Sequence, residues 1–564
     1  MAMKIVIAQA CALLASSSLA GAADVTFERL RKPEPQNWLT NHGDYDSHRF
    51  SALDKINKSN VKNLRLAFSV ALSGKGGNEN LVATPLVDDG FMYMPDAWGT
   101  VYKIDVRSGT SGPIVWKMDP GQEKMDRNRG VALWGNLVIS VTSHDGRVVA
   151  TDKETGKIVW EAKLRDQPDM TLNAAPLALK DNILIGASGG DQGVRNWLIA
   201  LDGKTGKEVW RYYPVPAPGE PGHETWKDNN NAWQTGGGAF YVTGSYDPDT
   251  NTTYWGSGNP SPKYDSSYRP GDNLHTNSAL AIDATTGKLR WYHQYTPNDT
   301  MDYDESGSHI LIDTKIGGED RKTVVRAARN GFAYSFDRLS GQFLKATQYV
   351  SQVTWTKGID PKTGKPVDYD PNKDLQTYAE PIAKMLTGAK SSFCPGVPGG
   401  NNFWSAAYSR KTKLLYIPEL EGCTSATRDQ ARHVRGSFDG GTFSYDGRVT
   451  SGIVVYDPAT GELKGRKDMP YPNSSGALAT AGGIVVTALL DGTIMALDDE
   501  TLEELWSINV GTGINAAPIT YEVDGRQYIA IATGLTRNQV GRIANTPELR
   551  TMSKHTTMLF VFGL

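Results

Sequence analysis

The chain contains 564 residues, among them 59 glycines and 29 prolines, and 9% of its residues are aromatic. Because turn-forming residues are frequent and no long stretch has the apolar spacing of an amphipathic helix, the composition indicates an all-β chain. The formal net charge is −3, and the sequence has no basic stripe, which argues against a nucleic-acid partner. No glycine- or serine-rich linker divides the chain, so we expect one continuous domain.

The first 23 residues have the pattern of a secretion signal. Lys4 supplies a positive charge, residues 5–19 form an apolar and small-residue run, and Ala-Gly-Ala at 20–22 fits a cleavage site. A membrane anchor is the weaker alternative, because the run is short and rich in Ser and Ala. We therefore predict a signal peptide at residues 1–23 and a mature chain at 24–564, exported to the bacterial periplasm and without a membrane span.

A short phrase, Ala-x-Asp-x-x-Thr-Gly-x-x-x-Trp, recurs along the chain. It occupies residues 150–160, 200–210 and 281–291, with a looser copy at 496–506 and degenerate copies around Asp105, Asp337 and Asp457. Each strong copy predicts a strand, a tight turn and a returning strand: the Asp side chain caps the turn, the Gly takes a positive φ, and the Trp begins the next strand. Repeats at periods of tens of residues bury the apolar face of each unit on its neighbour. The pattern predicts an all-β propeller with tryptophan-docked blades.

The spacing of the repeats also predicts the number of blades. Several successive turn aspartates lie about 50 residues apart, which suits one four-stranded blade per step. The longer steps, from Asp202 to Asp283 and from Asp337 to Asp457, must contain insertions. One blade is expected to combine an N-terminal strand with residues 558–562, which removes the open sheet edges. We expect eight blades in total.

The cysteines fit an oxidising compartment. Cys11 leaves with the predicted signal peptide, so the mature chain retains Cys394 and Cys423. Two cysteines without a competitor favour one disulfide in such a compartment, and two free buried thiols are the alternative. The chain has no Cys-x-x-Cys-His motif, so we expect no covalently attached haem and no cytochrome c domain.

Three further segments carry a family resemblance. They are Asn37-Trp38, residues 46–51 (Asp-Ser-His-Arg-Phe-Ser) and residues 254–260 (Tyr-Trp-Gly-Ser-Gly-Asn-Pro). Together with the docked blades and the secretion signal, they resemble the quinoprotein alcohol dehydrogenases over nearly the whole mature chain. Members of that family are eight-bladed propellers that hold pyrroloquinoline quinone (PQQ) and a metal ion on the axis. The resemblance implies both groups here, with Ca²⁺ as the metal and a lanthanide ion as the alternative.

The resemblance places quinone and metal contacts in two glycine-containing segments. In residues 185–195, Gly189 and Gly190 would let backbone N–H groups approach the quinone, and Ser188 would add a hydroxyl donor. Asp191 stands where the family has a metal-binding Glu, and Asn259 matches the second ligand, an amide oxygen. Such oxygen ligands suit a hard cation. The alternative for Asp191 is an ordinary turn residue beside glycines.

The reaction is expected within residues 296–304, Thr-Pro-Asn-Asp-Thr-Met-Asp-Tyr-Asp. Asp302 matches the family's general base, which takes the hydroxyl proton of the alcohol while hydride leaves the carbon, and it is also an implied metal ligand. The metal would polarise the quinone carbonyl. Asp304 points the same way as Asp302 if the segment is extended. In relatives an Asp at that place accompanies lanthanide use, and a solvated loop charge is the alternative.

Five more side chains match quinone-binding positions of the family. Arg329 precedes Asn-Gly and would reach the quinone oxygens, where a cation stabilises the reduced cofactor. Arg129, in Asn-Arg-Gly, matches a partner of the quinone carboxylates, which a guanidinium fork suits. For both arginines, surface salt bridging is the alternative. Tyr241 stands where many members have a Trp beneath the quinone plane, with core packing as the alternative. Asn173 and Asn402 are weaker matches.

The chain also departs from the family pattern. Glu123 and Lys124 replace two adjacent cysteines that form a ring stacked on the quinone, and Met301 replaces a Trp before the catalytic Asp. The loss of these groups predicts a pocket that is roomier or more polar than a methanol-sized one. In this respect the chain is similar to the branch that acts on sugars and polyols.

Two functions follow from these observations. The first is a periplasmic PQQ-dependent dehydrogenase that oxidises alcohols, polyols or sugars to aldehydes or ketones. It would pass electrons to a separate soluble cytochrome c, and a homodimer belongs to the same expectation. The second is a non-catalytic propeller scaffold of the outer-membrane assembly type. Because docking alone needs neither the implied metal ligands nor Asp302 and Arg329, their joint presence favours the enzyme.

Overall fold

The computed structural model describes residues 23–564, apart from 73–80, 435, 536–544, 551 and 553–555. Residues 1–22 of the predicted signal peptide, with Cys11, lie outside this described part. Within it the regular secondary structure is almost entirely β-strand, apart from short 3-10 segments and two short α-helices, α1 (Phe27–Arg31) and α2 (Glu380–Leu386). None of the described helices is long and apolar enough to cross a membrane. The all-β prediction is confirmed.

The strands pair mostly with their sequence neighbours, so the sheets follow one another along the chain. The first three sheets contain β3 (Leu86–Asp88), β4 (Phe91–Pro95), β5 (Val101–Asp105) and β6 (Ile114–Met118); β7 (Ala132–Trp134), β8 (Leu137–Thr142), β9 (Arg147–Asp152) and β10 (Ile158–Lys163); and β11 (Leu177–Ala178), β12 (Asn182–Gly186), β13 (Leu198–Asp202) and β14 (Glu208–Tyr212). The next two contain β15 (Ser245–Asp247), β16 (Thr252–Gly256), β17 (Ser278–Asp283) and β18 (Leu289–Gln294); and β19 (Ile310–Ile316), β20 (Glu319–Ala327), β21 (Phe332–Asp337) and β22 (Phe343–Gln348).

The remaining sheets of this series lie toward the C-terminus. They contain β24 (Ala407–Tyr408), β25 (Leu415–Glu421), β28 (Thr450–Tyr456) and β29 (Leu463–Met469); β30 (Ala477–Thr480), β31 (Ile484–Ala488), β32 (Thr493–Asp498) and β33 (Glu504–Asn509), joined by β1 (Phe50–Ser51); and β34 (Ile519–Val523), β35 (Arg526–Ala532) and β36 (Met558–Gly563), joined by β2 (Arg65–Ala71). These eight sheets of four or five strands are compatible with eight blades, a number that stays a prediction.

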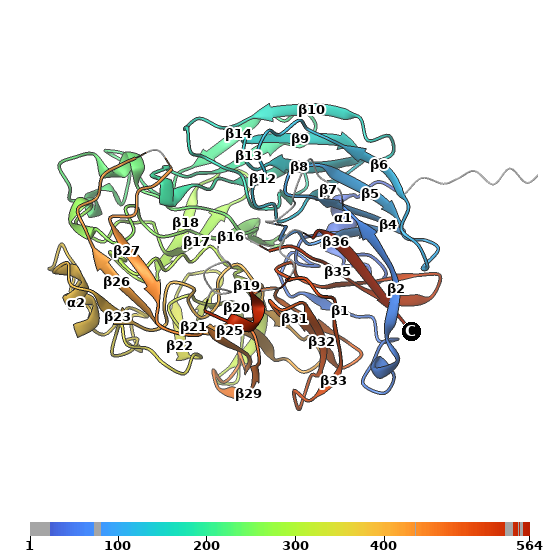
Figure 1. The fold of residues 1–564 in the computed structure, drawn as a ribbon. Coiled ribbons are helices and arrows are strands. Elements are labelled where there is room, and N and C mark those ends of the chain that lie inside the picture. The colour runs from blue at the N-terminus through green and yellow to red at the C-terminus, as the bar shows by residue number, and fades with distance from the viewer. Residues whose placement is uncertain (1–22, 73–80, 435, 536–544, 551, 553–555) are drawn as a thin grey trace, which may run out of the picture.

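A strand from the N-terminal part of the described chain and the C-terminal strand meet in one sheet. β2 pairs with β36 in antiparallel register, from Arg65 opposite Gly563 to Ala71 opposite Met558, and β36 pairs in turn with β35. Figure 1 shows β2 and β36 side by side near the C-terminus. The predicted closing sheet is therefore present, and neither β2 nor β35 presents an open edge on the side of β36.

The repeated tryptophans connect neighbouring sheets. The indole N–H groups of Trp116, Trp160, Trp210, Trp291 and Trp506 donate to backbone carbonyls in or beside the next sheet, those of Lys153, Gly203, Ala284, Arg338 and Leu64. Gly206 packs on the ring of Trp160, where a Cβ would come within 2.5 Å of a ring carbon. Its φ of +68° and the hydrogen bond from Thr205 N to Asp202 Oδ1 (2.8 Å) form the predicted turn. The tryptophan-docking prediction is confirmed.

Burial differs between the inner and outer strands of a sheet. In the first sheet β4 is buried along its whole length, whereas β6 is largely exposed. A strand that packs against a neighbouring sheet on both faces reads as a continuous apolar run, as β4 (Phe-Met-Tyr-Met-Pro) does. The core therefore lies between successive sheets, and the loops that join them are available for function.

A three-stranded sheet stands outside this series in the described chain. It contains β23 (Ser391–Phe393), β26 (Thr424–Arg428) and β27 (Gly441–Tyr445), from the long step between Asp337 and Asp457 where the sequence predicted insertions. Figure 1 shows it with α2 on the side of the view opposite β2 and β36. The predicted disulfide is confirmed: Cys394 and Cys423, beside β23 and β26, are bonded with their Cα atoms 4.5 Å apart.

Candidate active site

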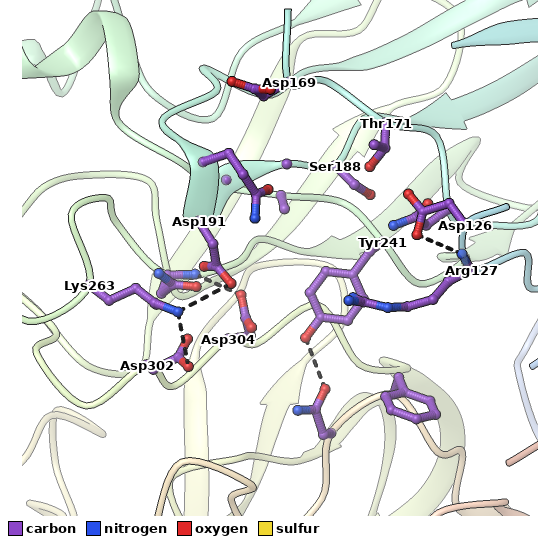
Figure 2. Close-up of a pocket in the computed structure, with 18 of the residues that line it drawn as sticks. Asp126, Arg127, Asp169, Thr171, Ser188, Asp191, Tyr241, Lys263, Asp302 and Asp304 are labelled. Atoms are coloured by element: carbon purple, nitrogen blue, oxygen red, sulfur yellow. Dashed lines mark hydrogen bonds and ion pairs between the residues drawn. The ribbon is translucent and has the colours of Figure 1, made fainter. Parts of the chain in front are cut away.

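A cavity of about 900 Å³ brings the predicted site residues together. Its lining includes Arg129, Asn173, Ser188, Gly189, Gly190, Asp191, Tyr241, Asn259, Asp302, Asp304, Arg329 and Asn402. These residues lie in loops of different sheets, so the packing of the sheets on one another makes them neighbours. Figure 2 shows the carboxylates of Asp191, Asp302 and Asp304 gathered on one side of the cavity, beside Tyr241.

The loop that follows β12 presents Asp191. Its turn is a short 3-10 segment, Gly190–Gln192, bounded by Gly189 at φ 105° and Gly193 at φ 77°. A Cβ at Gly189 would meet the carbonyl oxygen of Asp169 at 2.5 Å, so the backbone can approach this closely only with glycine. The Asp191 carboxylate is therefore held at the wall of the cavity by a turn that the glycines make possible.

Asp302 lies in an irregular loop and adopts φ 65°, a left-handed conformation that is uncommon outside glycine. Asp299 imposes this geometry, because its carboxylate accepts hydrogen bonds from Met301 N (3.1 Å) and Tyr303 N (3.0 Å). The segment is therefore not extended at Asp302. The expectation that Asp302 and Asp304 point the same way had assumed an extended segment. Asp302 and Asp304 nevertheless both line the cavity, because the turn brings them to the same wall.

Arg329 binds the second of these carboxylates. Its Nη1 donates to Asp304 Oδ2 at 2.6 Å, and its Nη2 lies 3.6 Å from Asp302 Oδ2. The backbone N–H of Arg329 donates to the buried Glu305 carboxylate (2.9 Å), while Nε donates to Val397 O. Asp304 is therefore a paired carboxylate whose side chain is only 14% exposed, and the alternative of a solvated loop charge is wrong.

Arg129 and Tyr241 form a second group on another wall. The Arg129 guanidinium lies 5.1 Å from the ring centroids of both Tyr241 and Phe403. The Tyr241 hydroxyl donates to Asn402 Oδ1 at 2.9 Å. Aromatic faces attract a guanidinium while leaving its N–H groups available. Burial lowers the pKa of Arg129 to about 10, which still leaves it charged at neutral pH.

Several buried polar atoms in this cavity have no hydrogen-bond partner among the described residues. They are Nε and Nη1 of Arg129, Asn173 Oδ1, Ser188 Oγ and Asp302 Oδ1. Buried polar groups are normally paired, so this concentration indicates a polar ligand. The carboxylate and carbonyl oxygens of PQQ would accept from Arg129 and Ser188, and a bound hydroxyl group would donate to Asp302 Oδ1. The side-chain oxygens of Asp191 and Asn259 are of the kind that a hard cation prefers. The residues present therefore fit a quinone and a metal ion.

Three carboxylates in or behind the cavity, those of Asp302, Asp304 and Glu305, have raised pKa values. Burial raises the pKa of Asp302 well above its ordinary value, an effect that nearby Lys263 and Arg329 oppose. Burial also raises the pKa of Asp304, again against Arg329. The pKa of Glu305, behind the site, rises to about 7 for the same reason. Desolvated carboxylates of this kind are typical of catalytic sites.

Sequence reasoning missed Lys263. Its ammonium lies 2.8 Å from Asp439 Oδ1, 3.5 Å from Asp191 Oδ2 and 3.9 Å from Asp302 Oδ2. It lies four residues beyond Asn259, but neither the repeat nor the motif spacing draws attention to a lysine there.

The segment in place of the absent cysteine pair also reaches the cavity, through residues 124–127.

The chain is similar to known proteins over most of its length. A family model described as "Glucose/ethanol/alcohol dehydrogenase, beta-propeller domain", of the PQQ type, matches residues 38–351 and 449–529. The quinohemoprotein alcohol dehydrogenase of Comamonas testosteroni is 34% identical over 551 residues, which cover 91% of this chain and 74% of the relative. The quinoprotein alcohol dehydrogenase PedH of Pseudomonas putida is 32% identical, with 93% of this chain and 91% of the relative covered.

Among solved structures, a europium-containing methanol dehydrogenase superposes with a TM-score of 0.86 and 30% identity. The match covers 95% of this chain and all of that one (100%). These relatives are dehydrogenases that act on CH–OH groups, so the prediction of an enzyme is confirmed over that of a scaffold. The chain belongs to the PQQ-dependent alcohol dehydrogenase family.

Proposed function

We propose that this protein is a periplasmic dehydrogenase that uses PQQ and a metal ion to oxidise an alcohol to an aldehyde or ketone. The observation that carries the proposal is the cavity in which Arg129, Ser188 and Asp302 keep buried polar atoms without partners. Metal ligands are assigned to Asp191, Asn259, Asp302 and Asp304. Quinone contacts are assigned to Arg129, Asn173, Ser188, Gly189, Gly190, Tyr241, Arg329 and Asn402.

In the proposed mechanism, bound PQQ supplies a two-electron acceptor for hydride, and the metal ion supplies Lewis acidity. Asp302 accepts the hydroxyl proton of the alcohol at Oδ1, the oxygen that has no partner among the described residues. Arg329 holds Oδ2 of the same carboxylate at 3.6 Å and so fixes which oxygen faces the substrate. Asn259 donates Nδ2 to Pro260 O (3.0 Å), which leaves its side-chain oxygen as the ligand atom.

A separate soluble cytochrome c is the proposed electron acceptor, as the family resemblance of the sequence implies. Export to the periplasm rests on the pattern of residues 1–23 and on the disulfide, which forms in an oxidising compartment.

Reconstitution tests the proposal. The purified protein is loaded with PQQ in parallel with Ca²⁺ and with La³⁺, desalted, and assayed for retained quinone and for dye-linked oxidation of simple alcohols, polyols and sugars. We expect retained quinone and turnover with at least one of the two ions. A protein that retains no quinone with either ion would refute the assignment of this cavity as a quinone site.

A further inference from the structure

Lys263 is a buried cation within the proposed metal site. It follows β16 in the chain, and only 10% of its side chain is exposed. Its ammonium lies 3.5 Å from Asp191 Oδ2 and 3.9 Å from Asp302 Oδ2. Figure 2 shows Lys263 pointing between these two carboxylates. In this arrangement the lysine neutralises the same two side chains that are assigned to the metal.

A third carboxylate holds Lys263 from outside the cavity lining. Asp439 Oδ1 lies 2.8 Å from the ammonium, and 39% of the Asp439 side chain is exposed. Asp439 lies between β26 and β27, in a stretch that the family match leaves out. The same stretch contacts the Asp191 turn, because Phe438 N donates to Asp191 O at 3.1 Å, and Tyr264 N donates to Asp439 O at 2.9 Å. This part of the chain therefore anchors Lys263 independently of Asp191 and Asp302.

The positive charge of Lys263 affects how strongly the site binds a metal ion. An ion bound to Asp191 and Asp302 lies close to the Lys263 ammonium, and two cations at such a distance in a buried site repel each other strongly. The repulsion is proportional to the charge of the ion, so it is larger for a trivalent than for a divalent ion. Asp304 does not compensate, because Arg329 already pairs with it at 2.6 Å.

We propose that Lys263 is a resident counter-cation of the metal site, which weakens metal binding and favours divalent over trivalent ions. Asp439 retains the ammonium when the metal takes Asp191 and Asp302. This inference rests on the proposed assignment of those two carboxylates as metal ligands. It identifies Lys263 as a residue that sets metal selectivity. Lys263 favours divalent ions, whereas in relatives an Asp at the place of Asp304 accompanies lanthanide use.

Calorimetric titration of the full-length protein, saturated with PQQ, with CaCl₂ and with LaCl₃ tests the proposal. Lys263→Met removes the charge and keeps a similar volume, and the Asp439 that it leaves unpaired is partly exposed to water. We expect Lys263→Met to bind Ca²⁺ about tenfold more tightly, and La³⁺ about thirtyfold more tightly, because the free-energy changes stand in the ratio of the ionic charges. Asp439→Asn should weaken the binding of both ions, since the ammonium then depends on Asp191 and Asp302.

Two control variants accompany this titration. Lys263→Arg keeps the charge and should leave the ratio of Ca²⁺ to La³⁺ affinity within about twofold of the wild type. Lys227→Met removes a surface lysine that pairs with Asp374 at 2.7 Å and should change neither affinity. If the wild type binds both ions and Lys263→Met binds them equally well or less well, the inference is wrong while the metal site stands. If neither the wild type nor Lys263→Met binds either ion, the metal site itself is refuted. If only Lys263→Met binds, the inference is supported.

Discussion

Charged side chains surround the carboxylate of Asp302, the proposed general base. Its backbone has a left-handed conformation, fixed by hydrogen bonds that the flanking Met301 and Tyr303 N–H groups donate to the Asp299 carboxylate. Lys263 and Arg329 face its Oδ2. Strained backbone at a buried carboxylate is typical of a functional residue. The position of this one oxygen therefore depends on a network of buried charges, each of which can be changed separately.

Asp302→Asn removes the proposed general base while keeping the shape of the side chain. A positioned base contributes about 10² to 10⁴ in rate, so we expect turnover of the reconstituted enzyme to fall by that factor, with quinone still retained after desalting. Asp320→Asn changes a carboxylate whose side chain is 86% exposed and should leave turnover unchanged. Wild-type turnover in Asp302→Asn would show that another group takes the proton.

We expect His309 to make the fold sensitive to acid. Its ring is buried between the Tyr295 hydroxyl (2.9 Å) and Gly307 O (3.0 Å), and burial lowers its pKa to about 3. An unfolded histidine takes its proton near pH 6.5. As the pH falls from about 6.5 toward 3, the unfolded state therefore gains a proton that the folded state does not, and stability is lost.

Replacing His309 by Gln removes this proton difference. Between pH 6 and pH 4, the free energy of unfolding of His309→Gln should decline less steeply than that of the wild type, by about 1 kcal/mol per pH unit. Urea unfolding at a series of pH values measures both slopes. Equal slopes for the two proteins would mean that His309 does not contribute to the acid sensitivity.

Among the elements, the contact between a repeat glycine and the tryptophan of the previous sheet joins successive sheets. Gly206 belongs to the turn between β13 and β14, and it lies on the ring of Trp160 from β10. The Trp160 indole N–H donates to Gly203 O of the same turn at 3.2 Å. Gly206 therefore has two roles. It supplies the positive φ of the turn, and it leaves room for the Trp160 ring to pack on the turn.

Gly206→Ala should destabilise the protein more than Gly219→Ala. Both glycines have positive φ, but a Cβ at Gly206 meets the Trp160 ring at 2.5 Å, whereas one at Gly219 meets nothing within 4 Å. Overpacking costs about 1–3 kcal/mol, and we expect this difference between the two variants in chemical denaturation. Equal destabilisation would mean that backbone strain alone determines the effect.

For the whole molecule, closure of the ring depends on β36. This strand contains three completely buried residues, Leu559, Val561 and Phe562. It pairs on one side with β2, from the N-terminal part of the chain, and on the other side with β35. Without β36, the hydrogen-bonding edges of β2 and β35 face solvent and can pair with other chains.

Truncation of residues 558–564 should therefore open the ring. Burial of three large apolar side chains contributes on the order of 5 kcal/mol or more, so we expect a large fall in melting temperature and aggregation in size-exclusion chromatography. Removal of Leu564 alone, which is 59% exposed, is the matched control and should leave the protein stable and monodisperse. A stable, monodisperse truncated protein would show that closure does not need β36.

The sequence by itself determined the propeller, the docked tryptophans, the closing sheet and, through the number of cysteines in the predicted mature chain, the disulfide. The family resemblance added twelve of the residues that line the cavity, without Lys263. The propeller, its tryptophans and the closing sheet could be read because they depend on local turn chemistry and periodic burial, and the twelve cavity residues could be read because they lie in motifs that the family shares. Only the tertiary structure decided how the charges pair: that Asp304 binds Arg329, that Asp302 has positive φ, and that Lys263 lies between the carboxylates. The charge pairs join side chains of different loops, 25 residues apart for Asp304 and Arg329, and no local sequence pattern records a contact that forms only when those loops pack together.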